Sequence, residues 1–98
     1  MTYTVRLREE AELDLEAAAG WYEAQRSGLG HEFLDSVADT LASIEKNPMS
    51  FPVVHRKIHR AVIYRFPFAI FYFVNGTEIT VLSVMHGSRH PSRWQRRT

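Results

Sequence analysis

The sequence predicts an α+β domain with an N-terminal strand, an antiparallel helical hairpin and then a three-stranded antiparallel sheet, both helices lying on one sheet face. Its apolar residues alternate before Glu9, recur every three or four residues up to Asn47, and follow strand patterns after Phe51. The length of 98 residues suits one domain over residues 1–98, and no repeat or linker divides it. An apolar fraction of 45% supplies a core without disulfides, since the chain has no cysteine.

The first strand and the helical hairpin are predicted from the two apolar periods. The strand covers residues 3–8, where apolar and polar residues alternate. The apolar face of the first helix has spacings of four, three and four, and comprises Ala11, Leu15, Ala18 and Tyr22. The corresponding face of the second helix comprises Leu34, Val37, Leu41 and Ile44. Gly28 and Gly30 separate the helices, Asn47-Pro48 ends the second, and we expect Trp21 to pack inside the hairpin with Tyr22.

Three strands are predicted after the helices, over residues 58–64, 66–74 and 78–86. Asn75-Gly76 favours a two-residue type I′ turn between the last two strands. That turn fixes a register with three pairs on one face, Tyr72 with Ile79, Ile70 with Val81 and Phe68 with Ser83. The other face then pairs Phe73 with Glu78, Phe71 with Thr80 and Ala69 with Leu82. The sheet is mixed if the first strand pairs parallel to a later one.

The helices can cover only one face of so small a sheet, and the first face is the more apolar. The second face carries polar groups such as Thr80 and His86, so we expect it to be accessible. Its apolar members would form a binding patch, comprising Phe71, Phe73, Leu82 and Val84. The alternative is that the C-terminal segment folds over this face.

The charges are divided between the two halves of the chain. Residues 1–50 hold four cations and ten acids, whereas residues 51–98 hold eight cations and only Glu78. A basic half favours an acidic partner or a phosphate backbone. The alternative is that the helices simply accumulate glutamate through its helix propensity.

The C-terminal segment 86–97 gathers cations, two imidazoles and an indole. Arginines such as Arg89 and Arg93 suit phosphates and carboxylates, since a guanidinium presents its donors as a planar fork. The indole of Trp94 could stack on a base, and a histidine beside arginines could act as a general base. The alternative is a solvated basic tail in which Trp94 packs on the core.

We expect no metal, no cofactor and no membrane partner. His55 and His59 lie four residues apart, but in a segment that does not favour a helix and has no nearby carboxylate, whereas a metal site needs three or more ligands. No phosphate-binding loop or nucleophile motif occurs. The N-terminus has no apolar signal region and no apolar run is long enough to span a bilayer, which predicts a soluble cytoplasmic protein.

The order of elements and a set of short motifs resemble the RelE/ParE superfamily of toxins from type II toxin–antitoxin operons. These motifs extend over nearly the whole chain: Ala11, Asp14-Leu15, Trp21-Tyr22-Glu23, Gly28-Leu29-Gly30, Phe33-Leu34, Asn47-Pro48, Phe51-Pro52, Phe66-Pro67-Phe68, Ile70, Tyr72, Val81-Leu82-Ser83-Val84, His86 and Arg89. The resemblance implies a growth-arresting toxin, of the kind that stabilises plasmids. It also implies an antitoxin that wraps the toxin with an acidic segment, giving a toxin–antitoxin hetero-oligomer.

The superfamily divides into two activities. RelE-like members are ribosome-dependent mRNA endonucleases that need no metal, and their pattern places an arginine where this chain has Ala69. ParE-like members inhibit DNA gyrase by binding, and the Phe-Pro-Phe motif with His86 and Arg89 is more similar to that branch. We therefore expect a ParE-like, non-enzymatic inhibitor. The alternatives are a RelE-like nuclease acting on ribosome-bound mRNA and a non-toxic interaction or nucleic-acid-binding module.

Three sets of site residues follow from these expectations. We expect the target to be contacted by Arg60, Arg89, Arg93 and Trp94. We expect the antitoxin to contact Phe71, Phe73, Leu82 and the basic tail. If the protein were a RelE-like nuclease, its catalytic residues would be Arg89, His86 and Arg60.

Overall fold

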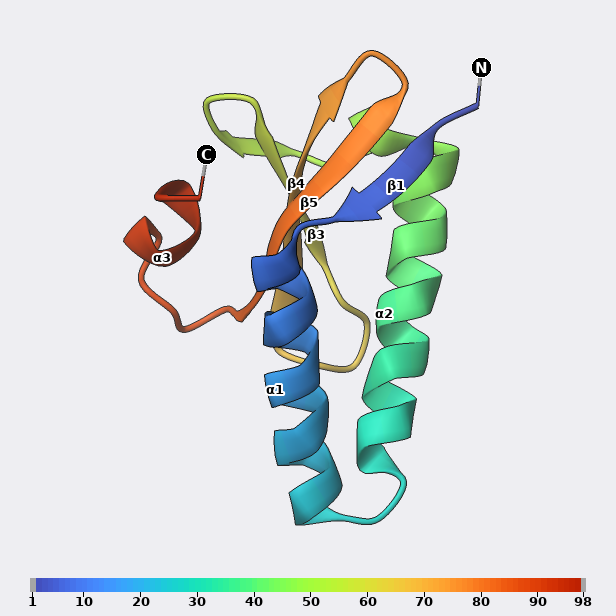
Figure 1. Ribbon diagram of the computed structural model, residues 1–98, viewed down its shortest axis with the longest axis vertical. Coiled ribbons are helices and arrows are strands. Elements are labelled where there is room, and N and C mark those ends of the chain that lie inside the picture. Colours follow the sequence, from blue (N-terminus) through green and yellow to red (C-terminus); the bar gives the residue numbers. More distant parts are fainter. Residues whose placement is uncertain (1, 98) are drawn as a thin grey trace.

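The computed structural model describes residues 2–97 and shows a helical hairpin packed on a five-stranded sheet (Figure 1). The elements in chain order are β1 (Thr4–Leu7), α1 (Glu9–Gln25), α2 (Leu29–Lys46), the 3-10 turn η1 (Pro48–Ser50), β2 (Val53–His55), β3 (Ile58–Val62), β4 (Phe68–Asn75), β5 (Glu78–His86) and α3 (Ser92–Gln95). The predicted α+β class and the order of strand, hairpin and sheet are confirmed. No helix in residues 2–97 has the length and apolar character needed to cross a bilayer.

The sheet has the strand order β1-β5-β4-β3-β2 and is mixed, because β1 pairs parallel to β5 while the other neighbours are antiparallel. It therefore contains two strands more than the predicted three-stranded unit. The first strand joins it at one edge, which is the mixed arrangement the sequence left open. The short β2 at the opposite edge was not predicted, because a three-residue strand beside Pro52 shows no clear alternation.

The two helices run antiparallel on one side of the sheet and extend beyond it (Figure 1). Gly28, at φ 90°, turns the chain between them. The Glu23 carboxylate accepts hydrogen bonds from the backbone N–H groups of Gly28 and Gly30, at 2.9 and 3.0 Å, which satisfies donors at the start of α2. Gly30 also lies against α1, where an added Cβ would stand 2.6 Å from the carbonyl oxygen of Ala19. Glycine thus allows the helices to approach closely.

The main core lies between the hairpin and the first face of the sheet. It includes Ile70, Tyr72, Ile79 and Val81 from the strands and Ala11, Ala18, Phe33, Val37 and Ile44 from the helices. On α2 the buried ring belongs to Phe33, whereas Leu34, expected inside, is 41% exposed. Trp21, also expected inside, is 60% exposed, while the neighbouring Tyr22 packs on the core. The spacing of the apolar residues identified the correct helices but was wrong about these two side chains.

The predicted register between β4 and β5 is wrong by two residues. Asn75 pairs with Glu78, so the two-residue loop is Gly76-Thr77 instead of Asn75-Gly76, and Tyr72 lies opposite Val81. A β-bulge then adds Leu82 as an extra residue, since Phe71 pairs with Ser83. Beyond the bulge the residues of β5 change sides.

The bulge places the end of β5 differently from the prediction. Val84 belongs to the main core and His86 packs on Phe68, 5.3 Å between ring centroids, so both lie on the helix side of the sheet. The sequence pattern predicts both on the opposite face, so this prediction is wrong. Ser83, expected on the helix side, lies opposite Phe71.

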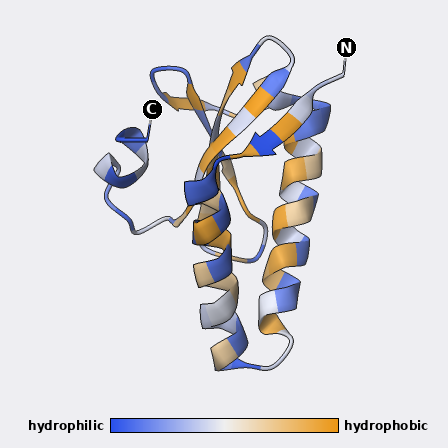
Figure 2. Cartoon of the chain, in the orientation of Figure 1, coloured by the Kyte–Doolittle hydropathy of each residue, from blue (hydrophilic) through white to orange (hydrophobic). Residues whose placement is uncertain are grey.

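The second face of the sheet is covered by the C-terminal segment. Trp94 of α3 stacks on Phe71 with ring centroids 4.3 Å apart and the planes inclined by 15°. Phe71 is 5% exposed and Leu82 is fully buried. The expected open patch is therefore closed by the chain itself, through a segment that Figure 2 shows as largely hydrophilic.

Candidate functional site: a groove between α1 and the C-terminal segment

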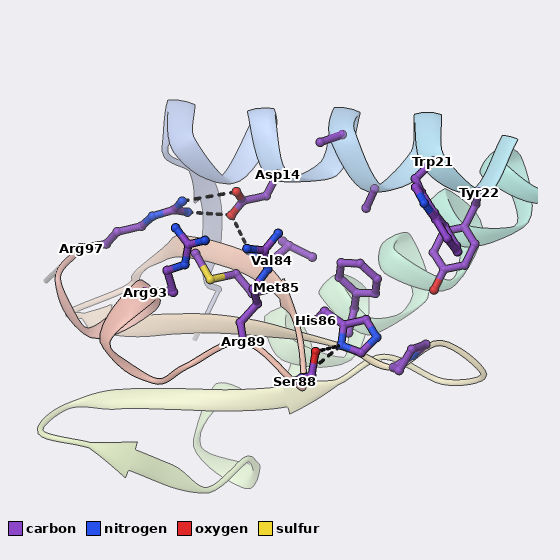
Figure 3. A pocket seen from close by; sticks show the side chains of 14 residues that line it. Asp14, Trp21, Tyr22, Val84, Met85, His86, Ser88, Arg89, Arg93 and Arg97 are labelled. Atoms are coloured by element: carbon purple, nitrogen blue, oxygen red, sulfur yellow. Dashed lines mark hydrogen bonds and ion pairs between the residues drawn. The ribbon is translucent and has the colours of Figure 1, made fainter. Parts of the chain in front are cut away.

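A groove of about 710 Å³ lies between α1 and the C-terminal segment, next to the end of β5 (Figure 3). Its walls come from α1, from the start of β4, from the end of β5 and from the segment that follows. The apolar lining residues are Ala17, Ala18, Trp21, Tyr22, Pro67, Phe68, Val84 and Met85. Tyr22 and Phe68 form the floor of the groove. The Tyr22 ring is held there by edge-on packing against Phe66 and Phe68, with ring centroids 5.0 and 6.0 Å from its own. The groove is thus an apolar depression that continues outward to the exposed Trp21 ring.

Three arginines of the C-terminal segment line the other side of the groove (Figure 3). Arg97 is neutralised, since its guanidinium pairs with Asp14 of α1. Arg89 and Arg93 are exposed and form no ion pair within residues 2–97. Their charges therefore face solvent beside an apolar floor, and they could bind a carboxylate or a phosphate.

His86 lies beside Ser88 and Arg89 in the lining of the groove (Figure 3). The backbone N–H of Ser88 donates to its Nδ1 at 3.0 Å, and the Ser88 hydroxyl lies 2.8 Å from the same atom. Because an N–H group can only donate, Nδ1 acts as an acceptor and the proton of the neutral ring lies on Nε2. The ring is held by its own turn and by Phe68, so His86 shapes the groove wall.

The structure brings only part of the expected target-binding set together. Arg89 and Arg93 share the groove. Arg60 is exposed but pairs with Phe71 in the β3–β4 ladder, which places it on the opposite face of the sheet. Trp94 is 6% exposed, so in this conformation its ring serves α3 packing and is not presented to a target.

The expected antitoxin-binding residues lie beneath α3 or beside cations. Phe71 and Leu82 lie beneath Trp94, which packs on this face of the sheet because the helices already cover the other face. Phe73 is half-buried, with Lys57 Nζ 4.4 Å and Arg8 Cζ 5.8 Å from its ring centroid. These three residues do not form an open apolar patch in the free chain.

The histidines in the sheet have structural roles. His59 stacks on Tyr72 at 5.0 Å and its Nδ1 donates to the carbonyl oxygen of Phe51 at 2.8 Å. His55 lies against Trp94, with centroids 5.9 Å apart. Among residues 2–97 no group of three or more His, Cys, Asp or Glu side chains is placed to hold a metal ion.

Sequence reasoning missed three residues that build the groove. Trp21 was expected in the core, and Asp14 and Arg97 were not considered as a pair. The only signal in the sequence was the spacing of Ala17 and Trp21, which lie one helical turn apart and off the predicted apolar face of α1, and so indicate a second apolar side of this helix. The Asp14–Arg97 pair joins residues 83 positions apart, for which a single sequence carries no signal.

Comparisons with known proteins identify the family. The family described as "ParE toxin of type II toxin-antitoxin system, parDE" matches residues 5–91 of the chain. A structure of the chromosomal ParDE system from P. aeruginosa superimposes with a TM-score of 0.78 at 16% identity, covering 87% of this chain and 96% of that one. The toxin–antitoxin complex RelBE2 from Mycobacterium tuberculosis gives 0.64 at 19% identity, covering 88% and 99%. No curated protein sequence matches the chain.

Both structural similarities confirm the fold, and the family match extends over most of the chain, from β1 to the turn before α3. The resemblance drawn from the short motifs is thereby confirmed at the level of the superfamily. This chain belongs to the ParE toxin family of type II toxin–antitoxin systems.

Proposed function

We propose that this toxin blocks DNA gyrase by binding it in the cytoplasm, and that a cognate antitoxin neutralises it by binding the toxin directly. The observation that carries the proposal is the groove, where Arg89 and Arg93 present unpaired charges beside an apolar floor. Such a surface suits the binding of a protein partner, because an apolar centre supplies affinity and charges at the rim supply specificity.

The arrangement of the cations supports inhibition by binding over mRNA cleavage. A metal-free nuclease must direct several donors at one phosphate, and loss of one preorganised donor typically costs about 10²–10³ in rate. Here Arg60 and His86 lie on opposite faces of the sheet, so they do not converge on one phosphate. Ala69, at the arginine position of the nuclease pattern, is buried and uncharged.

Within this proposal the expected contact residues have different parts. Arg89 and Arg93 touch the target. Trp94 acts indirectly, by anchoring α3 and with it Arg93. Arg60 takes part only if the target reaches around to the other side of the sheet.

The test is a gyrase supercoiling reaction, run in parallel with translating ribosomes and labelled mRNA. We expect the purified chain to inhibit supercoiling without cleaving the mRNA. The double variant Arg89→Ala/Arg93→Ala should lose inhibition, whereas Arg96→Ala, an exposed arginine outside the groove, should keep it. Cleavage of mRNA without gyrase inhibition would support the nuclease function. If the chain showed neither effect, the remaining alternative would be a non-toxic interaction module.

A further inference from the structure

We infer that the second face of the sheet, around the edges of α3, binds the phosphate backbone of duplex DNA through Arg8, Lys57 and Arg60. The inference adds a ligand at a surface distinct from the groove. It rests on the proposed function only in the choice of DNA over RNA, because an inhibitor of DNA gyrase meets its target on duplex DNA.

The charges of the chain are separated between the two faces of the sheet. The ten acidic residues of the first half all lie in α1 and α2, which cover the first face. The only other acidic residue of the chain is Glu78, and its carboxylate already pairs with Arg6 at 3.5 Å. Among residues 2–97, further cations on the second face therefore have no free carboxylate side chain beside them.

Two unpaired cations converge on one aromatic ring of this face. Lys57, in the turn between β2 and β3, places Nζ 4.4 Å from the ring centroid of Phe73, and Arg8, just after β1, places Cζ 5.8 Å from the same centroid. They approach from opposite sides of β4, and neither forms an ion pair within the described residues 2–97. Like charges held this close repel each other, and an anion bound between them would remove that repulsion.

Arg60 extends the cationic surface along β3. It is exposed and pairs with Phe71, two residues before Phe73 on β4, so its side chain lies on the same face. It too forms no ion pair in the described part of the chain. Neighbouring strands lie about 4.8 Å apart, so cations from the edge of β1 to β3 span roughly 15 Å. A single small anion does not reach all three cations, whereas a polyanion does.

The aromatic rings of this face favour a phosphate backbone over other polyanions. Phe71 and Trp94 are only 5% and 6% exposed, and the ammonium group of Lys57 lies over Phe73. These rings therefore offer neither a stacking surface for an unpaired base nor an apolar centre for a protein partner. A duplex needs neither, because it presents one phosphate charge per about 1.7 Å on its outside.

The test is the binding of a fluorescently labelled DNA duplex to the purified chain, measured by anisotropy between about 50 and 200 mM salt. Three phosphate contacts predict a slope of about −2.7 for the logarithm of the binding constant against the logarithm of the salt concentration. Lys57→Ala and Arg60→Ala should each weaken binding severalfold and reduce the slope by about 0.9. Arg8 is left intact, because it also donates to the carbonyl oxygen of Arg97.

Lys46→Ala is the matched control, since it removes one exposed, unpaired cation from the end of α2 and should leave the slope unchanged. Absence of salt-dependent binding, an equal loss in Lys46→Ala, or equal binding of polyglutamate would each overturn the inference. Tighter binding of single-stranded DNA or of duplex RNA would overturn the assignment of duplex DNA as the ligand.

The binding reaction contains no gyrase, so its outcome is independent of the test of the proposed function. Arg89→Ala/Arg93→Ala, the variant expected to lose gyrase inhibition, should still bind the duplex, because both arginines line the groove. If the chain failed to bind DNA but inhibited gyrase, only this inference would fall. If it bound DNA without inhibiting gyrase, only the proposed function would fall.

Discussion

Asp14 and Arg97, 83 positions apart, form an ion pair that continues the edge of the sheet where β1 ends. The last residue pair between β1 and β5 joins Leu7 to Val81. Beyond it, the Asp14 carboxylate accepts a hydrogen bond from the Val84 N–H at 3.0 Å, and Arg97 donates to the carbonyl oxygen of Leu82. The two side chains thus replace a strand, and they fasten the C-terminal segment to α1.

Substitution of Asp14 by Ala should lower the free energy of unfolding by about 1–3 kcal/mol, because it leaves the Arg97 guanidinium and the Val84 N–H without their acceptor. Urea unfolding followed by circular dichroism measures the change. Glu16→Ala, an exposed acid two residues along the same helix, is the control and should change stability very little. Equal effects of the two substitutions would contradict the assignment of Asp14 as a structural partner.

Substitution of Trp94 by Ala should open the second sheet face, because the ring that covers Phe71 is removed. We expect a loss of about 3 kcal/mol and increased binding of an apolar dye. Trp94→Phe keeps an aromatic ring on the sheet and should retain most of the stability. Unchanged dye binding in Trp94→Ala would show that α3 is held without its indole.

Tyr72→Phe should cost about 1–2 kcal/mol, since the buried hydroxyl donates to the carbonyl oxygen of Pro48 at 2.6 Å and that oxygen would lose its donor. Tyr64→Phe is the matched control, because Tyr64 is 79% exposed. Urea unfolding at neutral pH gives both values. A cost as small as that of the control would contradict the structural role of the hydroxyl.

The same tyrosine gives stability a pH dependence in alkali. Burial raises the pKa of Tyr72 to about 12, above the value of about 10 expected for an unfolded chain. A group with a raised folded pKa contributes stability that is fully present below the unfolded pKa and is lost as pH rises towards the folded pKa. Stability should therefore fall between about pH 10 and 12. This component should be absent in Tyr72→Phe, and an unchanged alkaline profile in that variant would assign the fall to other groups.

Two glycines on the helical hairpin should respond to alanine in opposite directions. Gly30→Ala places a Cβ 2.6 Å from the Ala19 carbonyl oxygen, so the helices must separate at a cost of about 1–3 kcal/mol. Gly20→Ala meets nothing within 4 Å inside α1 and should stabilise the protein by about 0.5–1 kcal/mol. Thermal unfolding of the two variants gives the comparison, and a melting temperature raised in Gly30→Ala would show that the hairpin is not tightly packed there.

Most of the fold followed from local patterns. The bounds of β5 and the order of strand, hairpin and sheet could be predicted because apolar periodicity and the glycines of the interhelical turn act over a few residues. The register between β4 and β5 could not be predicted in this way, because a turn shifted by one residue changes every residue pair between the two strands. The bulge at Leu82 could not be predicted either, because it depends on packing on both sides of the sheet.

The candidate site was only partly predictable. The basic C-terminal segment was evident from composition, and Arg89 and Arg93 do lie together at the groove. The position of Trp94 required the tertiary structure, because a basic tail and a covering helix have the same sequence signature. Trp21 was misplaced because α1 carries apolar residues on two sides, which helical spacing alone does not distinguish.

The bulge at Leu82 also decides on which side of the sheet the end of β5 lies. Leu82 is a single additional residue in β5, and the faces on which the side chains of the following residues lie depend on whether it is held outside the ladder. If β5 alternated regularly through Leu82 with no bulge, Val84 would turn out of the interior and the imidazole of His86 would lie on the far side of the sheet. The arginine-bearing end of the chain therefore reaches α1 only because β5 holds Leu82 outside the ladder, and a further residue inserted between Val81 and Val84 would have to be accommodated in the same way.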